Sequence, residues 1–295
     1  MIRLFTETNR IHLPRLGKLR LKEKPLLPVS SRILSATVSR SADRWYVALT
    51  VEEEHPKPEP NEGPVIALDK GLSVFAALSS GITIPKPKFL LRQARKQRRL
   101  AKAHSRKQKS SNNKRKSTLR LARFYHRIIN QRHNFLHQTS AYLAKNHSVI
   151  VTEDLHVKGL MRNKKLSKYW TDLSHGMFQR LLSYKAPLYG STVIEIDRWF
   201  PSSKLCSNCL YYHRDLVLAD RVYRCPLCGL VLDRDHNAAL NIANYYYTYQ
   251  PLLLVAESSA ETLNACGEAV RPAFKPARVV ESGRTAPRTF KSNYF

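Results

Sequence analysis

The chain has 295 residues, of which 43% are hydrophobic, and its 50 Lys and Arg against 22 Asp and Glu give a formal net charge of +28. This length accommodates one large domain or two to three small ones, and the hydrophobic content is that of a folded protein rather than a disordered one. A chain this basic repels itself unless a polyanion neutralises it, so nucleic acid is the expected partner. An anionic membrane surface is the alternative, but no long basic amphipathic helix with a Trp, Phe or Leu face stands out.

The sequence shows no targeting signal and no membrane span. Residues 1–7 contain no apolar core and no cleavage site of a signal peptide. No stretch approaches the ~18 apolar residues that cross a bilayer. We therefore expect no membrane partner and a cytoplasmic protein, associated with the nucleoid in a prokaryote.

Residues 1–55 are predicted to be rich in β-strands. Apolar and polar residues alternate over 34–39 and, more loosely, over 45–51, and Ser41-Ala42-Asp43 between these runs predicts a hairpin. A Pro-rich segment at 54–64 can continue neither a strand nor a helix, which predicts a boundary there.

A three-strand meander is predicted next. A buried-type strand at 65–69 ends in Asp69, and a turn at Gly71 leads to further strands at 74–78 and 82–84. A strongly basic segment follows the meander. Residues 70–152 contain no acidic residue but 20 Lys and Arg, and 18 of these fall in 86–132.

Apolar residues in this basic segment recur at helical spacing on both sides of a polar hinge at 110–113, which predicts two helices. Solvated charged faces usually mix signs, so a run of one sign favours contact with a phosphate backbone. Binding through many phosphates should weaken steeply with salt.

The remaining elements alternate between strands and helices. A second buried strand at 148–155 carries Glu153, a helix is expected around 172–184, and another strand at 191–197. The last helix should begin near Asp235 and continue through Ala243. From 246 onward the periodic signals are few, and we expect a disordered tail.

Four of the five cysteines form two CxxC pairs separated by 15 residues, a spacing typical of a structural zinc site. These ligands are Cys206, Cys209, Cys225 and Cys228. Four thiolates leave no open coordination position, so the Zn²⁺ should hold structure. The alternative, a redox dithiol, is typical of a single CxxC in a βαβ context. Gly229 suits the turn after the second pair, whereas Leu210 follows the first pair where a small residue would be easier. Cys266 stands alone and is expected to be inert.

Three carboxylates form the candidate catalytic site, and each has a structural alternative. Asp69 could start a turn before Gly71, Glu153 could pair with a Lys, and Asp235 could cap its helix. Together, two acids at strand ends and one at a helix start favour a shared Mg²⁺ site, because carboxylates are the ligands that hard cations prefer. Such a trio can hold two ions ~3.5–4 Å apart. The order of elements is the one that an RNase H-like nuclease core requires.

From residue 34 to 243 the chain resembles the OrfB/TnpB family of transposon-encoded proteins, relatives of the type V CRISPR effectors. The matching motifs are Ala67-Leu68-Asp69-Lys70-Gly71-Leu72, Val151-Thr152-Glu153-Asp154-Leu155, Asp197-Arg198-Trp199-Phe200-Pro201-Ser202-Ser203-Lys204, both CxxC pairs, and Asp233-Arg234-Asp235-His236-Asn237-Ala238-Ala239. The resemblance implies an α/β fold: an RNase H-like, RuvC-type nuclease core with a basic helical insertion and a four-cysteine zinc ribbon, preceded by a β-rich partial wedge domain.

The resemblance also implies residue roles. Asp69, Glu153 and Asp235 match the catalytic, Mg²⁺-binding acids, and Asp233 is expected to support them. Lys70 should point to the opposite face of the strand from Asp69. The residues expected to bind nucleic acid on the basic helices are Arg95, Lys96, Arg98, Arg99, Arg115 and Arg123. The domains expected are a partial wedge with linker at 1–60, a core at 61–204 with an insertion at 86–140, a ribbon at 205–229, a nuclease helix at 230–245 and a tail at 246–295.

We therefore expect a Mg²⁺-dependent, RNA-guided DNA endonuclease, with guide RNA and a DNA target as partners, in an N-terminally shortened version. Guide pairing would read the sequence of the target while the protein reads its shape. A nucleic-acid-binding protein without productive cleavage is the second hypothesis. A DNA-joining transposase is the third, and strand-transfer products would separate it from the others.

Overall fold

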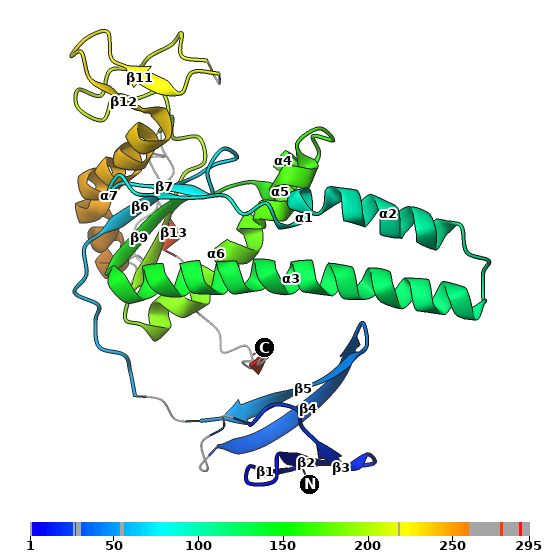
Figure 1. The fold of residues 1–295 in the computed structure, drawn as a ribbon. Coiled ribbons are helices and arrows are strands. Elements are labelled where there is room, and N and C mark those ends of the chain that lie inside the picture. The colour runs from blue at the N-terminus through cyan, green and yellow to red at the C-terminus, as the bar shows by residue number, and fades with distance from the viewer. Residues whose placement is uncertain are drawn as a thin grey trace, which may run out of the picture. The chain divides into compact units, whose positions relative to one another are not determined.

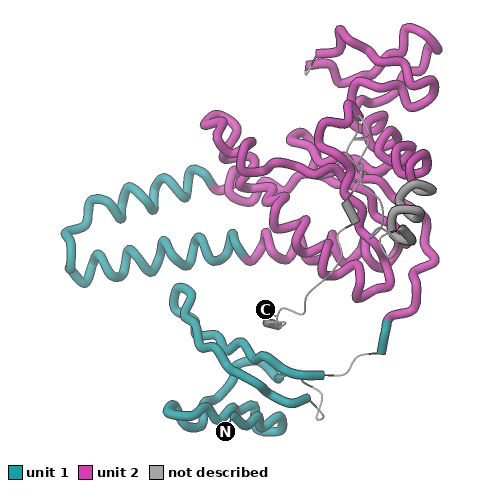
Figure 2. The backbone as a smooth tube through the Cα atoms, turned by 180° about the vertical axis from the view of Figure 1, so that it is seen from behind, with its two compact units in different colours: residues 1–57, 94–129, 283–295 teal, residues 58–93, 130–282 magenta. Residues whose placement is uncertain are grey.

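The computed structural model describes residues 2–25, 27, 31–53, 56–217, 219–259, 278–279 and 289–290. The chain divides into two compact units, coloured separately in Figure 2. The first unit contains residues 1–57, 94–129 and 283–295, and the second contains residues 58–93 and 130–282.

The first unit begins with β-strands, as predicted. An antiparallel sheet contains β1 (Arg3–Phe5), β2 (Arg10–Leu13) and β3 (Gly17–Arg20). The long strands β4 (Arg32–Ser41) and β5 (Arg44–Glu52) form a hairpin, and β14 (Thr289–Phe290) pairs with β5. Ala42 begins the two-residue turn with a φ of 56°, a left-handed conformation that tight hairpin turns use. The predicted hairpin is therefore confirmed.

The first unit also contains two basic helices, again as predicted. α2 (Ala94–Ser105) and α3 (Asn112–Asn146) run side by side in opposite directions (Figure 1). Gln97 Nε2 donates to Tyr125 Oη at 2.9 Å, and Lys114 Nζ donates to the carbonyl of His104 at 2.9 Å, which joins the two helices. The unit boundary falls within α3, after residue 129.

The second unit is a mixed α/β structure built on one sheet. The strands are β6 (Ile66–Lys70), β7 (Ala76–Leu78), β8 (Thr83–Ile84), β9 (Val149–Glu153), β10 (Thr192–Ile196) and β13 (Arg278–Val279). Their order is β13-β10-β9-β6-β7-β8. β6, β9 and β10 are parallel, while β7 and β8 complete the predicted antiparallel meander.

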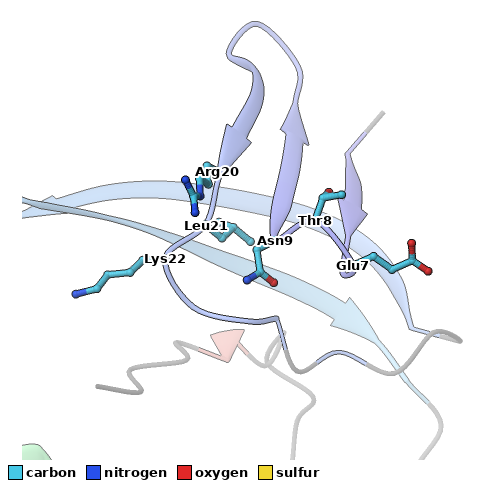
Figure 3. A pocket seen from close by; sticks show the side chains of 6 residues that line it. All are labelled: Glu7, Thr8, Asn9, Arg20, Leu21 and Lys22. Atoms are coloured by element: carbon cyan, nitrogen blue, oxygen red, sulfur yellow. The ribbon is translucent and has the colours of Figure 1, made fainter.

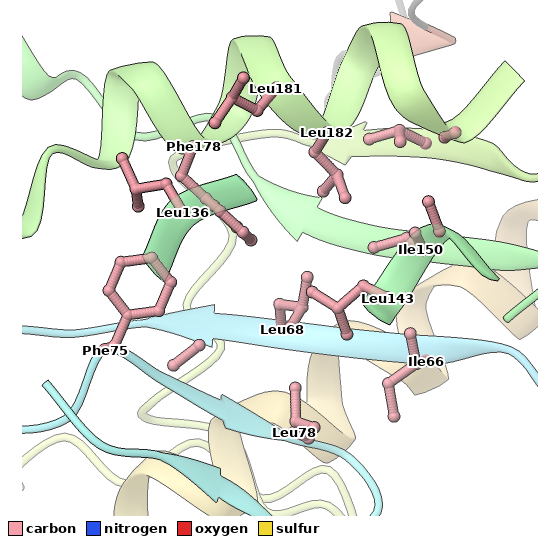
Figure 4. Close-up of a cluster of buried hydrophobic side chains, with 14 of the residues drawn as sticks. Ile66, Leu68, Phe75, Leu78, Leu136, Leu143, Ile150, Phe178, Leu181 and Leu182 are labelled. Atoms are coloured by element: carbon pink, nitrogen blue, oxygen red, sulfur yellow. The ribbon is translucent and has the colours of Figure 1, made fainter. Parts of the chain in front are cut away.

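Helices cover both faces of this sheet because its central strands are apolar on both sides. On one face, Ile66, Leu68 and Ile150 pack against α6 (His175–Leu188) and the second half of α3, as Figure 4 shows. On the other face, Ala67 and Val151 pack against α7 (Arg234–Ser259). Alternation along β6 therefore separates two cores, one on each side of the sheet.

The helix expected around 172–184 corresponds to α6, and a shorter helix that was not predicted precedes it. α5 (Ser167–Leu173) ends at Ser174, whose φ of 54° is left-handed, and α6 begins directly after it. The side-chain hydroxyl of Ser174 donates to the carbonyl of Thr171 at 2.8 Å, which stabilises the break. Two other short helices were not predicted, α1 (Phe89–Arg92) and α4 (Val157–Met161).

The prediction that a disordered tail begins at 246 was wrong for its first part, because α7 continues to Ser259. Tyr245 and Tyr246 are buried and Tyr249 is partly buried in the core that α7 forms with the sheet, so the helix gains packing that periodicity alone did not reveal. Most of the rest of the expected tail, including Cys266, lies outside the described residues.

The strands β11 (Val222–Arg224) and β12 (Val231–Asp233) form an antiparallel pair that links the second cysteine pair to α7. Tyr223, in the middle of β11, is fully buried and packs with Cys206 and Cys225. In the part of the chain that the structure describes, no helix is both long enough and apolar enough to cross a bilayer.

Candidate active site and four-cysteine centre

Two of the predicted catalytic acids lie at the ends of adjacent parallel strands. Asp69 is in β6 and Glu153 ends β9, and each acid directly follows the paired residues Leu68 and Thr152 of these two strands. Asp69 is paired with Ala77 inside the sheet, so it does not start a turn as the alternative held. Because side chains alternate along a strand, both acids point to the face that α7 covers.

Asp235, the third acid, is in the first turn of α7. Its Oδ2 accepts a hydrogen bond from Ser73 Oγ at 3.2 Å, and Oδ1 lies 3.3 Å from the guanidinium of Arg234. The helix cap is a different residue, Asp233, whose Oδ1 accepts from the backbone N–H groups of Asp235 and His236. The alternative that Asp235 caps the helix was therefore wrong, and its carboxylate faces other side chains.

The three acids lie within electrostatic reach of one another. The pKa of Asp69 is raised to about 8, mainly by burial and then by the negative charges of Glu153 and Asp235. Burial also raises the pKa of Glu153. A buried carboxyl group whose pKa is raised by neighbouring carboxylates is a feature of catalytic and metal-binding sites, because a bound cation would relieve the repulsion.

Glu153 has a hydroxyl partner rather than the lysine partner of the alternative. Ser202 Oγ donates a short hydrogen bond to Glu153 Oε1, and this contact lowers the pKa of Glu153 against the effect of burial. Ser202 is itself buried. The neighbouring acid, Asp154, instead forms an ion pair with Arg198 on the loop that leads to Ser202.

Lys70 follows Asp69 but points to the other face of the sheet, as predicted. Its Nζ donates to Gln179 Oε1 on α6 at 3.0 Å, and Gln179 Nε2 donates to Glu195 Oε1 at 2.6 Å. Burial lowers the pKa of Lys70 to about 8. The cation is thus held by a network on the α6 side and leaves the α7 side to the carboxylates.

The carboxylates suit a hard divalent cation by their chemistry. Within the described residues, only the four cysteines bring three or more His, Cys, Asp or Glu ligand atoms within 4.8 Å of one another. The carboxylate oxygens of Asp69, Glu153 and Asp235 do not form such a group, although all three acids lie on the side of the sheet that α7 covers.

The four cysteines form a compact cluster, as predicted. Cys206 Sγ lies 3.6 Å from Cys228 Sγ, and Cys209 Sγ lies 3.5 Å from Cys225 Sγ. A tetrahedron of Zn–S bonds of about 2.3 Å has S–S edges of about 3.8 Å, so the cluster fits a Zn²⁺ ion. Hydrogen bonding by the backbone N–H of Leu230 lowers the pKa of Cys228 to about 6, whereas burial raises the pKa of Cys206, so the pKa values do not shift in one direction across the cluster.

The two cysteine pairs have the same backbone hydrogen-bond pattern. The N–H of Cys206 donates to the carbonyl of Tyr211, and the N–H of Cys225 donates to that of Leu230. Leu210 and Gly229 occupy equivalent places after the pairs, and both have left-handed φ values, 61° and 73°. The sequence expectation that Leu210 stands where a small residue would be easier is explained by this conformation.

Three asparagines on α7 were missed by the sequence reasoning. Asn237 Nδ2 donates to the carbonyl of Leu205, Asn241 Nδ2 donates to the carbonyls of Ser202 and Leu205, and Asn244 Nδ2 donates to that of Ser207. We call these residues the asparagine ladder. Their spacing, four and then three residues apart, places them on one helix face, and this periodicity was the available signal.

All six predicted nucleic-acid-binding residues are exposed in the first unit. Five of them lie in α2 or in the first turns of α3. Arg123 is the sixth, and it already forms an ion pair of 2.8 Å with Asp43 at the tip of the β4–β5 hairpin.

A separate depression of about 450 Å³ lies beside the β1–β2 turn of the first unit. It is lined by Glu7, Thr8, Asn9, Arg20, Leu21 and Lys22 (Figure 3). The labelled side chains point in different directions and do not converge on a common point, so they do not form a recognisable site.

Comparisons with known proteins identify the family of the chain. Residues 48–164 match the OrfB_IS605 family model, described as "Probable transposase", and residues 175–242 match the model "Cas12f1-like, TNB domain". A Streptomyces pristinaespiralis protein named "Putative RNA-guided DNA endonuclease" is 37% identical over 260 residues, which cover 87% of this chain. The chain belongs to the OrfB/TnpB family.

Other members of the OrfB/TnpB family match in the same way. The Escherichia coli protein "Putative RNA-guided DNA endonuclease InsQ" is 27% identical over 285 residues, or 92% of this chain. The alignments cover 60% of the Streptomyces protein and 67% of the E. coli protein, so the chain matches about three fifths to two thirds of these relatives. A cryo-EM structure of a Cas12f1-sgRNA-target DNA complex is similar with a TM-score of 0.46 and 16% identity, covering 70% of this chain and 55% of that one.

Proposed function

We propose that this chain is a transposon-associated, RNA-guided DNA endonuclease with an RNase H-like, RuvC-type core. The observation that carries the proposal is the set of three acids from β6, β9 and α7 on one face of the sheet, with the pKa of Asp69 raised to about 8. The sheet supports it, since a three-strand antiparallel meander is followed by two strands parallel to the first.

The residues that would hold Mg²⁺ are Asp69, Glu153 and Asp235, and the ions would supply an activated water and a stabilised leaving oxygen. Around them, Ser73 and Ser202 orient the carboxylates of Asp235 and Glu153 by hydrogen bonds. The four cysteines would hold Zn²⁺ as a structural ion, because they complete its coordination without an open position.

The partners proposed are a guide RNA and a DNA target. The names of the relatives state an RNA-guided DNA endonuclease, and the net charge of +28 agrees with a polyanionic partner. The exposed Arg and Lys of α2 and α3 are proposed to contact the phosphate backbone. Such an enzyme would act in the cytoplasm, at the nucleoid of a prokaryotic host.

The experiment is to purify the protein, sequence the RNA bound to it, and test that RNA for guided DNA cleavage with Mg²⁺. Asp69→Asn, Glu153→Gln and Asp235→Asn should each abolish cleavage while RNA binding persists. Glu62→Gln is the matched control, because it removes an exposed carboxylate just before β6. Cleavage that survives the three substitutions would reject the catalytic site.

A nucleic-acid-binding protein without productive cleavage is the second candidate, since the net charge of +28 favours binding to a polyanion whether or not the carboxylates hold metal. It predicts stable RNA and DNA binding with intact substrate at every Mg²⁺ concentration. A DNA-joining transposase would instead yield strand-transfer products in the same assay.

A further inference from the structure

The loop at 201–205, just before the first cysteine of the proposed zinc-binding segment (residues 205–233), contacts a predicted catalytic acid. Ser202 lies four residues before Cys206, and its Oγ donates to Glu153 Oε1 on β9. Ser202 is 6% exposed and Cys206 is fully buried, so the loop has little freedom at either point. A carboxylate with one oxygen held by a hydroxyl keeps a fixed rotamer and leaves its second oxygen for another ligand.

The asparagine ladder fixes this loop to the helix that carries Asp235. Asn241 Nδ2 lies 2.7 Å from the carbonyl oxygens of both Ser202 and Leu205, and the side chain is 1% exposed. Because a carbonyl oxygen can only accept a hydrogen bond, the amide nitrogen of Asn241, and not its oxygen, must face the loop. Glu153, through Ser202, is therefore tied to the same helix as Asp235.

We propose that Ser202 is a positioning residue for Glu153, held in place by Asn241, and that it sets the affinity of the carboxylate cluster for a divalent cation. The inference rests on the proposed function, because it takes Glu153 as a metal ligand. Partners that orient a metal ligand commonly change metal affinity about 10- to 100-fold when they are removed.

The test is Mn²⁺ binding to the purified, zinc-loaded chain without DNA, followed by electron paramagnetic resonance or calorimetry, alongside thermal unfolding. Ser202→Ala should weaken Mn²⁺ binding about tenfold, and Ser202→Thr, which keeps the hydroxyl, should restore most of it. Ser183→Ala is the matched control, because its hydroxyl bonds within α6 to the carbonyl of Gln179. This control should keep the wild-type affinity.

A second pair of variants separates positioning from general stability. Asn241→Ala should weaken Mn²⁺ binding, whereas Asn244→Ala, which loses a hydrogen bond to Ser207 on the far side of Cys206, should not. If Ser202→Ala binds Mn²⁺ as tightly as the wild type while Glu153→Gln binds it more weakly, the positioning role of Ser202 is wrong but the proposed metal site stands. If Glu153→Gln also binds Mn²⁺ normally, Glu153 is no ligand, and both this inference and the proposed metal site are wrong.

Discussion

The carboxylate of Asp233 accepts a hydrogen bond of 3.0 Å from the backbone N–H of Asp235, so the two acids of one short motif have different partners. The same Asp233 oxygen accepts from the N–H of His236 at 3.1 Å and satisfies two N–H groups of the first turn of α7. The side chain of Asp235 instead meets Ser73 and Arg234.

Asp233→Ala should therefore lower the free energy of unfolding by about 1 kcal/mol, the usual cost of removing a helix cap. Asp233→Asn should keep most of the stability, because an amide oxygen can also accept from the backbone. Urea unfolding of both variants measures the difference. A destabilisation by Asp233→Asn as large as that by Asp233→Ala would show that charge, rather than capping, is the main contribution.

The stability of the protein without Mg²⁺ should depend on the protonation of Asp69. Its pKa is raised from 3.8 to about 8 in the folded state, mainly by burial, so folding favours the protonated form. This stabilisation is fully present below pH 3.8 and is lost as the pH rises through about 8. Between these limits the wild type should lose stability with rising pH, measured by urea unfolding at a series of pH values.

Asp69→Asn is the control for this pH dependence, because an amide of the same shape cannot ionise. Its unfolding free energy should fall less steeply over the same pH range. Parallel pH profiles for the two proteins would show that Asp69 ionises normally.

The zinc site should bind one metal ion per chain and should require both cysteine pairs. Cys209→Ser or Cys225→Ser should release zinc and expose the amides of residues 205–233 to hydrogen exchange, because structural Zn²⁺ contributes directly to local folding. Cys266→Ser is the matched control, since this cysteine lies outside both pairs. Retention of zinc by either pair variant would contradict a four-thiolate site.

The equivalence of Leu210 and Gly229 predicts opposite effects of two substitutions. Leu210→Gly should stabilise the zinc-binding segment by about 0.5–1 kcal/mol, because the relief of the left-handed strain exceeds the entropy that glycine adds to the unfolded chain. Gly229→Ala should destabilise the segment by a similar amount. Nothing lies within 4 Å of a Cβ added at this position, so the substitution tests the backbone conformation and not a steric clash. Thermal unfolding of the zinc-loaded variants measures both effects.

Binding of RNA to the basic helices should be governed by charge. Arg98→Gln should reduce the slope of the logarithm of the binding constant against the logarithm of salt concentration by about one. Arg98→Lys keeps the charge and should keep the slope. An unchanged slope for Arg98→Gln would mean that this exposed residue makes no phosphate contact.

Much of the fold was predictable because the signals were local. Alternation and turn residues located the hairpin, the meander and the strands that carry Asp69 and Glu153, and the CxxC pairs located the four-cysteine cluster. The break at Ser174 was not predictable, because a serine rarely adopts the left-handed conformation seen there. The extension of α7 depends on tyrosines packing against a distant sheet, which periodicity over a short window does not reveal.

The residues of the candidate site remain a prediction, whereas their contacts in the structure could not be predicted from the sequence. The roles of Asp233 and Asp235 could be told apart only when the start of α7 was known to within one residue. The contact between Ser202 and Glu153 joins positions 49 residues apart, so no local pattern indicates it. The asparagine ladder has helical spacing, but its acceptors are backbone carbonyls, which every sequence contains.

The opposite orientation of Asp69 and Lys70 limits which genetic changes β6 can tolerate. Substitutions keep the phase of the strand, whereas inserting or deleting one residue within it inverts which side chain meets which face. Such a change would bring a cation to the α7 side and a carboxylate to Gln179, and it would exchange the two apolar surfaces at the same time. Variation in length should therefore be confined to the segments outside β6, such as the Pro-rich linker before it and the turn after it.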